Sequence, residues 1–428
     1  VGVPAVTPEA GRPRGVYYGW YVIAVAFATT GLAVGTGQYA FGVYVRPLEQ
    51  EFGWTRTQVN AALSLGAVSG LIAPLVGRLT DRFGSRRVMA LSLLMIALSY
   101  LLRPFMTQLW QWYALNVLMF IGFPGATILP AGKLVGLWFE RTRGRMMGLT
   151  TMGNNFGGLT MAPLAGYIVG ASGWLWGYVA FGLLALLVAP AAALVVRDRP
   201  EDVQREQARW EGAGRHSEGR GGSARRVVSG LTVREALRSP TFYLMTLGLL
   251  LAGFTYPSVL TQLIPHMENE GVPVQRAALA LSVLAGFGMA GKLAFGLLAE
   301  RITARYALML SLSMQVGCLV LLLSIRANSP LLWLFVALIG LPFGAVGALM
   351  PLIVQETFGL RHFASLLGLV NMATVVSSIV GPLLAGASFD ATGSYRANFM
   401  AVMGIFSLGV VVLGLARRPA MARAQDAP

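Results

Sequence analysis

Long runs of apolar residues, separated by charged residues, proline and glycine, recur along the whole chain. An α-helix of about 20 apolar residues can span a bilayer, because it satisfies its own backbone hydrogen bonds where water is absent. We therefore expect an all-α membrane protein with twelve transmembrane helices. The predicted helices lie at residues 18–45, 57–80, 87–107, 109–139, 144–171, 173–196, 240–266, 276–299, 305–326, 329–357, 364–389 and 395–416.

Residues 197–239 interrupt this pattern and divide the predicted helices into two sets of six. The segment is rich in Arg, Glu and Gly, and its one apolar piece is a short amphipathic stretch at residues 231–237. It predicts a cytoplasmic linker, which we interpret as a flexible tether. A regulatory or lipid-surface role for its arginines is the alternative. The expected organisation is an N-terminal six-helix bundle at 1–196, the linker at 197–239, and a C-terminal six-helix bundle with a short tail at 240–428.

The two sets of helices resemble each other at a spacing of roughly 220 residues. Duplication of this kind is expected of transporters that rock two bundles about a central site. The repeat therefore predicts two pseudo-symmetric bundles. Its matches are Gly77-Arg-Leu-Thr-Asp81-Arg82 with Gly296-Leu-Leu-Ala-Glu300-Arg301, Gly148 with Gly368, and Pro163-Leu-Ala-Gly166 with Pro382-Leu-Leu-Ala-Gly386.

Composition and charge agree with a membrane protein. Charged residues make up 12% of the chain, whereas soluble domains carry about 25%. The net charge of +15 does not indicate a nucleic-acid partner, because the arginines are sorted by side: 25 lie in segments on one side of the predicted helices and six near the other. This positive-inside pattern places both termini in the cytoplasm. We expect a multi-pass protein of a bacterial-type inner membrane, with the lipid bilayer as a partner.

Enzymatic chemistry has little support in the sequence. The three histidines, His216, His266 and His362, have no metal-ligand spacing, and no nucleophile motif or phosphate-binding glycine loop is present. Cys318 is the single cysteine, which excludes an intrachain disulfide and indicates a packing role. The N-terminus lacks the features of a signal peptide, so we expect the first helix to be retained. We expect no enzyme activity, no cofactor and no metal site.

The segment between the second and third predicted helices carries a recognisable motif. It reads Gly77-Arg-Leu-Thr-Asp81-Arg82-Phe-Gly84-Ser-Arg86-Arg87, and it resembles the signature loop of the major facilitator superfamily. Gly77 permits close helix contact, Asp81 can cap a helix or pair with an arginine, and the basic cluster holds the loop in the cytoplasm. A purely topogenic arginine cluster is the alternative. We expect a cytoplasmic gate made of Gly77, Asp81, Arg82, Gly84, Arg86 and Arg87.

Further stretches narrow the resemblance to the monocarboxylate porter and oxalate:formate antiporter branch. They span nearly the whole chain, and the branch implies transport of small organic carboxylates. The stretches are Tyr18-Gly-Trp-Tyr21, Phe52-Gly-Trp54, Trp138-Phe139 with Arg143-Gly144, Arg197-Asp-Arg-Pro-Glu-Asp202, Phe358-Gly with Arg361-His-Phe363, and Phe389-Asp-Ala-Thr-Gly-Ser-Tyr-Arg396.

The two lysines of the chain, Lys133 and Lys292, both fall inside predicted helices. A lysine at the bilayer centre costs about 3 kcal/mol on insertion scales, so it needs a partner, a wet cavity or a function. Lys292 lies nine residues before Arg301, about 13 Å from the cytoplasmic end of its helix. No Asp or Glu lies deep in any predicted helix, so a transported carboxylate would supply the missing charge. A neutral or snorkelling lysine is the alternative.

The resemblance adds an expectation for Lys292. The equivalent helix-eight position of the branch usually carries an arginine that binds the substrate carboxylate. Lysine keeps the charge but loses the bidentate geometry. Lys133 lies near the end of its helix, where it can snorkel to water or make a second substrate contact. If both lysines face the cavity, a dicarboxylate also fits.

Other polar residues in the predicted helices are candidates for the substrate pocket. Amide and phenol groups suit a carboxylate or hydroxyl, although the same groups often serve as hydrogen bonds between helices. The candidates are Gln38, Tyr39, Asn116, Asn154, Asn155, Tyr256, Gln262 and Asn371.

We therefore expect a secondary active transporter that moves a small organic anion, a mono- or dicarboxylate, by alternating access. The resemblance implies an acid near the helix-eight base in proton-linked porters, but the i−4 position here is Gly288. Proton-linked symport and anion exchange both stay open, with protons or a counter-transported anion as partners. Efflux of an amphipathic or lipophilic compound is the alternative. A receptor without transport would need a signalling domain, which the polar linker cannot form.

Overall fold

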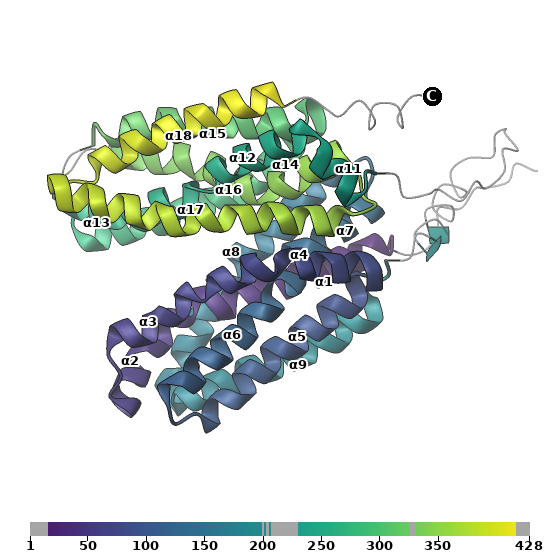
Figure 1. Cartoon of the computed structure of the whole chain (residues 1–428). Coiled ribbons are helices and arrows are strands. Elements are labelled where there is room, and N and C mark those ends of the chain that lie inside the picture. The colour runs from purple at the N-terminus through teal and green to yellow at the C-terminus, as the bar shows by residue number, and fades with distance from the viewer. Residues whose placement is uncertain (1–15, 199–200, 203–204, 207–229, 326–330, 417–428) are drawn as a thin grey trace, which may run out of the picture.

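A computed structural model describes residues 16–198, 201–202, 205–206, 230–325 and 331–416. These residues form helices and turns, with one isolated bridge between Gly230 and Gly359. The helices make two six-helix bundles that are stacked one above the other in Figure 1. The expected flexibility of the linker concerns mainly residues 207–229, which lie outside the described residues. The boundaries predicted for the bundles and the linker stay a prediction.

The N-terminal bundle contains nine α-helices, a π-helix and a short 3-10 helix in the described residues. They are α1 (Gly19–Val34), the π-helix η1 (Gly35–Tyr39), α2 (Phe41–Phe52), α3 (Arg56–Ser64), α4 (Gly66–Phe83), α5 (Ser85–Leu102), the 3-10 helix η2 (Arg103–Phe105), α6 (Leu109–Ala126), α7 (Ile128–Trp138), α8 (Arg143–Ser172) and α9 (Trp174–Val195).

The C-terminal bundle follows the short helix α11 (Val233–Arg238). The described part of this bundle consists of α12 (Pro240–Ala252), the π-helix η3 (Thr255–Leu260), α13 (Thr261–Asn269), α14 (Val274–Ile302), α15 (Ala304–Leu322), α16 (Leu331–Phe358), α17 (Phe363–Thr392) and α18 (Arg396–Leu415).

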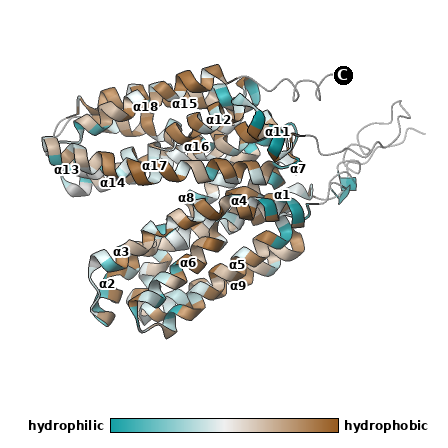
Figure 2. Cartoon of the chain, in the orientation of Figure 1, coloured by the Kyte–Doolittle hydropathy of each residue, from teal (hydrophilic) through white to brown (hydrophobic). Residues whose placement is uncertain are grey.

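Eleven helical segments in the described residues are long and apolar enough to cross a membrane. Figure 2 shows hydrophobic residues along most of their length. The twelfth, α8, has 30 residues but falls short on hydropathy because it is rich in Gly, Thr and Asn. It packs against both α1 and α14, which cover part of its polar surface. The predicted all-α fold of twelve long helical segments is confirmed.

Several predicted helices are interrupted. Residues 109–139 form two helices that meet at Thr127, with φ −120° and ψ −126°. Pro130 lacks the N–H that would bond to the carbonyl of Ala126, so a regular helix cannot continue there. The predicted helices at 18–45 and 240–266 contain the π-helices η1 and η3. Pro257 within η3 likewise removes a backbone donor.

The short helix α11 lies close to the C-terminal bundle. The Leu231 N–H donates to the carbonyl of Phe358 at 2.9 Å. Thr232 and Glu235 form a capping box at the start of α11, and the Thr232 N–H lowers the pKa of the Glu235 carboxyl. We call this end of the molecule, where residues 196–198, 230–232 and α11 lie, the linker end. The opposite end carries α2, α3 and α13 (Figure 1).

The two bundles touch through glycines near the linker end, where α4 packs on α17 and α8 packs on α14. A Cβ atom at Gly144 would overlap the carbonyl oxygen of Gly296, and one at Gly77 would overlap that of Ala364. By contrast, Gly166 near the other end of α8 has open space around it. The bundles therefore close on each other at the linker end, and Figure 1 shows them diverging toward the opposite end.

Candidate functional site

Lys292 lies on α14 and is 7% exposed. Its ammonium donates hydrogen bonds to the Thr151 carbonyl at 2.8 Å and to Asn155 Oδ1 at 2.5 Å, both on α8 of the other bundle. No ion pair in the described part of the chain involves Lys292. Because an ammonium has three donors, one N–H of Lys292 has no acceptor among the described residues.

Lys292 lies where the closed part of the bundle interface ends. Toward the linker end, a Cβ atom at Gly148 would overlap the Lys292 carbonyl oxygen. Toward the opposite end, a Cβ atom at Gly288 would meet its nearest neighbours only at 3.7 Å, and Asn155 Nδ2 donates to the Ala285 carbonyl at 3.3 Å. The space between the bundles therefore lies beyond Asn155, which still bridges α8 and α14 next to Lys292.

Two tyrosines from different bundles face this space. Tyr39 of η1 is 41% exposed and Tyr256 of η3 is 51% exposed. The Tyr256 ring lies 6.2 Å from the ring of Phe343 on α16, measured between centroids. We infer that the substrate space lies between the bundles at this level, bordered by Lys292, Asn155, Tyr39, Tyr256 and Phe343, and we call it the central cavity.

The other predicted pocket residues lie in different surroundings. Asn154 precedes Asn155 on α8, and its buried Oδ1 has no hydrogen-bond partner among the described residues. Gln38 is exposed on η1, and Gln262 is half-buried on α13. The Asn371 side chain donates to the Leu367 carbonyl of its own helix. The substrate contacts predicted for these four residues stay predictions.

Asn116 is fully buried inside the N-terminal bundle, where its Oδ1 accepts a hydrogen bond from Arg103 at 3.1 Å. Arg103 is 2% exposed, and its Cζ lies 4.5–4.8 Å from the ring centroids of Tyr100, Trp112 and Tyr178. Sequence reasoning singled out Asn116 but did not identify Arg103 or this aromatic cage. The aromatic residues of the cage come from three different helices, so no local sequence pattern reveals the cage.

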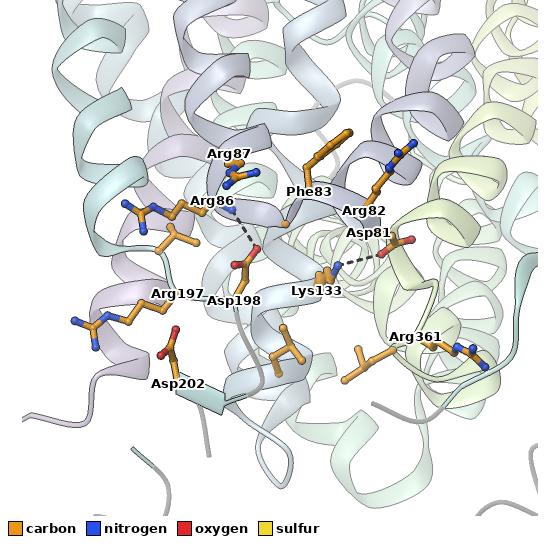
Figure 3. A pocket seen from close by; sticks show the side chains of 14 residues that line it. Asp81, Arg82, Phe83, Arg86, Arg87, Lys133, Arg197, Asp198, Asp202 and Arg361 are labelled. Carbon is orange, nitrogen blue, oxygen red and sulfur yellow. Dashed lines mark hydrogen bonds and ion pairs between the residues drawn. The ribbon is translucent and has the colours of Figure 1, made fainter. Parts of the chain in front are cut away.

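Lys133 lies at the linker end, within the closed part of the interface. Its ammonium pairs with Asp81 Oδ1 at 3.2 Å and donates to the Thr80 carbonyl at 3.0 Å. The expected pairing of Asp81 with an arginine does not occur in the described residues, because the Arg82 side chain points away from Asp81 (Figure 3). Lys133 therefore has an internal acid, unlike Lys292, and a substrate contact by Lys133 stays an untested prediction.

Asp81 also joins the two bundles. It accepts hydrogen bonds from the Ser365 N–H at 2.8 Å and the Ser365 hydroxyl at 2.7 Å, at the start of α17. Glu300, its counterpart in the repeat, accepts the Arg145 N–H at 2.8 Å and pairs with the Arg145 guanidinium at 3.1 Å, at the start of α8. A carboxylate at a helix N-terminus is favourable because the backbone N–H groups there carry partial positive charge.

A pocket of about 850 Å³ lies beside this contact. Its walls include Asp81, Lys133 and Asp198, and Asp198 Oδ2 accepts the Arg86 N–H at 3.4 Å. The guanidinium groups of Arg82 and Arg361 point away from its centre (Figure 3). Because these cations do not converge, the pocket is not built to hold a single anion. The remaining residues of the predicted gate, Gly84, Arg86 and Arg87, also line it.

Two membrane-spanning helix bundles related by an internal repeat have the architecture of a polytopic membrane transporter. A family model described as Major Facilitator Superfamily matches residues 23–372 and 292–428. The chain therefore belongs to the major facilitator superfamily.

Curated proteins similar to this chain carry a more specific name. Monocarboxylate transporter 3 from Rattus norvegicus is 32% identical over 396 residues, which cover 91% of this chain and 78% of that protein. Monocarboxylate transporter 2 from Homo sapiens is 25% identical over 414 residues, covering 93% of this chain and 85% of that protein.

Solved structures of the superfamily share the fold. The proton:xylose symporter XylE, bound to 6-bromo-6-deoxy-D-glucose, aligns with a TM-score of 0.69 at 13% identity, over 94% of this chain and 96% of that chain. The transporter FucP in the outward conformation aligns with a TM-score of 0.67 at 12% identity, over 93% of this chain and all of that chain.

Proposed function

We propose that this protein is a secondary active transporter of a small organic monoanion, and that Lys292 binds the substrate carboxylate. The observation that carries the proposal is the position of Lys292, a buried cation at the edge of the central cavity with one N–H free and no acid paired to it in the described residues. A carboxylate entering the cavity supplies both the missing acceptor and the missing charge. The names of the similar monocarboxylate transporters support the same substrate class.

The charges around the cavity favour a monocarboxylate over a dicarboxylate. Lys133 is paired with Asp81 near the linker end. Arg103 is enclosed by aromatic rings within the N-terminal bundle. Among the described residues this leaves Lys292 as the cation that borders the cavity without a counter-ion, so a second carboxylate would have no cation to meet.

Alternating access fits the arrangement of the bundles. The arginine pattern supports a cytoplasmic linker end. Since the bundles close at that end, the structure then corresponds to an outward-facing state. The two equivalent acids, Asp81 and Glu300, would hold this state through their contacts with α17 and α8. Cytoplasmic opening would break these contacts and the hydrogen bonds from Lys292 to α8.

The coupling ion is a separate question. Gly288 stands one turn before Lys292, and no Asp or Glu borders the cavity among the described residues. Exchange of one anion for another requires no such acid. In proton-linked symport, the proton would travel on the substrate or on Lys292. Uptake into proteoliposomes driven by a pH gradient or by an internal anion separates the two modes.

The test of the proposal is the set of Lys292 variants. We expect Lys292→Ala to abolish binding and transport of organic monoanions without loss of folding, because removing an unpaired charge relieves an insertion cost. Lys292→Arg should retain partial function and Lys292→Gln should not, since only arginine keeps the charge. The measurements are proteoliposome transport and ligand-induced thermal stabilisation of the purified protein. The proposal would be contradicted if all three variants transported at the parental rate. It would also be contradicted if only neutral or cationic compounds stabilised the protein, and that result would favour efflux of an amphipathic compound.

A further inference from the structure

Two π-helices occupy equivalent places in the two bundles. The first, η1, begins at Gly35 after α1, and the second, η3, begins at Thr255 shortly after α12. Their spacing of roughly 220 residues is the spacing of the internal repeat. π-helices are rare and occur frequently at functional sites. A matched pair at repeat-equivalent positions is therefore a feature of the architecture and calls for an explanation.

Each π-helix is held in place by the same kind of contact. The Tyr100 hydroxyl of α5 donates to Thr36 Oγ1 in η1 at 3.0 Å. The Thr255 hydroxyl in η3 donates to Gln315 Oε1 of α15 at 3.0 Å. All four residues are buried, with exposures of 0–4%. The backbone of both segments is thus anchored to a neighbouring helix of its own bundle.

Each π-helix carries one partly exposed tyrosine, Tyr39 in η1 and Tyr256 in η3. On one side the Tyr39 ring lies against Gly158 of α8, where a Cβ atom would come within 2.7 Å of the ring. On the other side the Tyr256 ring pairs with Phe343 at an interplanar angle of 30°. No hydrogen bond to either tyrosine hydroxyl occurs among the described residues, and both rings are partly exposed. These rings are therefore available to a ligand.

The rings lie close to the cation. Gly158 is three residues beyond Asn155, which binds the Lys292 ammonium. On the other bundle, a Cβ atom at Gly288 would lie 3.7 Å from Phe343 and 3.9 Å from Asn155 Nδ2. Three residues of α8, a rise of about 4.5 Å, thus separate Asn155 from the glycine against which the Tyr39 ring lies. A compact substrate can reach the ammonium and the ring at once.

We propose that Tyr39 and Tyr256 form an aromatic clamp for a planar ring of the substrate, so that this transporter prefers monocarboxylates carrying an aryl group. The inference rests on the proposed function, in which Lys292 holds the carboxylate. Aromatic pairs in offset or edge-to-face arrangements are stabilised beyond the burial of their area. A saturated ring of similar size buries the same apolar area but lacks this additional stabilisation between aromatic rings. Aryl carboxylates of the benzoate, phenylacetate and arylpyruvate types fit both features.

The test compares phenylacetate with cyclohexylacetate, which has the same charge and a similar size but a saturated ring. Binding to the full chain in detergent is measured by calorimetry. We expect phenylacetate to bind several-fold to about tenfold more tightly. Tyr39→Leu and Tyr256→Leu should each reduce the ratio, and the double variant should bring it close to one. Tyr39→Phe should keep most of it, because the ring remains.

Tyr243→Leu provides the matched control, since Tyr243 is 59% exposed on α12 and is not part of the clamp. Its ratio of phenylacetate affinity to cyclohexylacetate affinity should equal that of the parental protein. The unfolding temperature of each variant without ligand shows whether the variant is folded. Equal affinities for the two acids in the parental protein, or a ratio that survives in the double leucine variant, would overturn the clamp. If both acids bind through Lys292 without preference, the clamp alone fails. If neither acid depends on Lys292, the proposed function itself fails.

Discussion

Arg103 and Lys292 are both buried cations in the membrane-spanning part of the chain, but different groups surround them. Arg103 contacts three aromatic rings and an amide oxygen. A cation–π contact contributes about 2 kcal/mol when it is desolvated, so three of them offset an insertion cost of about 3 kcal/mol. Lys292 has two oxygen contacts and no ring. This difference is why we assign anion binding to Lys292.

The Arg103 assignment can be tested by Arg103→Gln. We expect this change to destabilise the protein by about 2–4 kcal/mol, because it removes the cation from its aromatic cage and leaves a void. Affinity for cyclohexylacetate should stay within about twofold of the parental value. Thermal unfolding and calorimetry give the two quantities. Unchanged stability with lost affinity would instead make Arg103 a second anion contact.

For single residues, the sequence could predict how deep a side chain lies in the membrane but not which side chains it contacts. Lys292 and Asn155 were both predicted for the substrate pocket, and the structure joins them by a hydrogen bond. The pairing of Lys133 with Asp81 joins residues 52 positions apart, which no local pattern reveals. Gly296, one turn after Lys292, contacts the backbone at Gly144, which the sequence does not reveal. A small residue leaves room that either a ligand or another helix can fill.

Helices α8 and α14 touch through backbone atoms near the linker end, so their glycines control how closely the bundles approach. We expect Gly144→Val to weaken this closure, because the added side chain would overlap Gly296 and overpacking costs about 1–3 kcal/mol. The reporter is a cysteine at Ala364, which is fully buried, in a Cys318→Ala background. Its labelling rate should rise about tenfold.

Gly166→Val is the matched control for this experiment, since a Cβ atom at Gly166 of the same helix has open space. The cysteine at Ala364 should be labelled at the same rate in the Gly166→Val protein as in the reporter protein that keeps both glycines. Equal rates in the Gly144→Val and Gly166→Val proteins would contradict a closure made by glycine contacts.

The existence of the helices was predictable and their interruptions were less so. Apolar runs predicted eleven of the long helical segments, because length and hydropathy suffice for a membrane span. The twelfth, α8, was predicted although its hydropathy is low. The π-helices η1 and η3 were not predicted, since a π-helix adds one residue to a turn without changing hydropathy. These two interruptions carry Tyr39 and Tyr256. The most informative departures from regular helix therefore coincide with the proposed clamp.

For the whole molecule, orientation in the membrane is the first quantity to measure. The arginine pattern predicts that the linker end faces the cytoplasm. In a Cys318→Ala background, we expect a membrane-impermeant maleimide to label Glu268→Cys in intact cells. Glu268 is exposed on α13, at the opposite end. Ser217→Cys, in the linker, should react only after the cells are opened. Labelling of both positions from outside would reverse the orientation and with it the assignment of an outward-facing state.

The polar surface of α8 also bears on how this chain is made. A translocon recognises segments by their hydropathy, and α8 is a weak signal while α9 directly after it is a strong one, with a mean hydropathy of 2.3. Only Gly173 separates the two helices. Insertion of α8 therefore depends on its entering as a hairpin with α9, against an α1 that has already been synthesised. If α8 alone stayed outside the membrane, every later helix would enter with its direction reversed, so the orientation of the C-terminal bundle depends on this pairing.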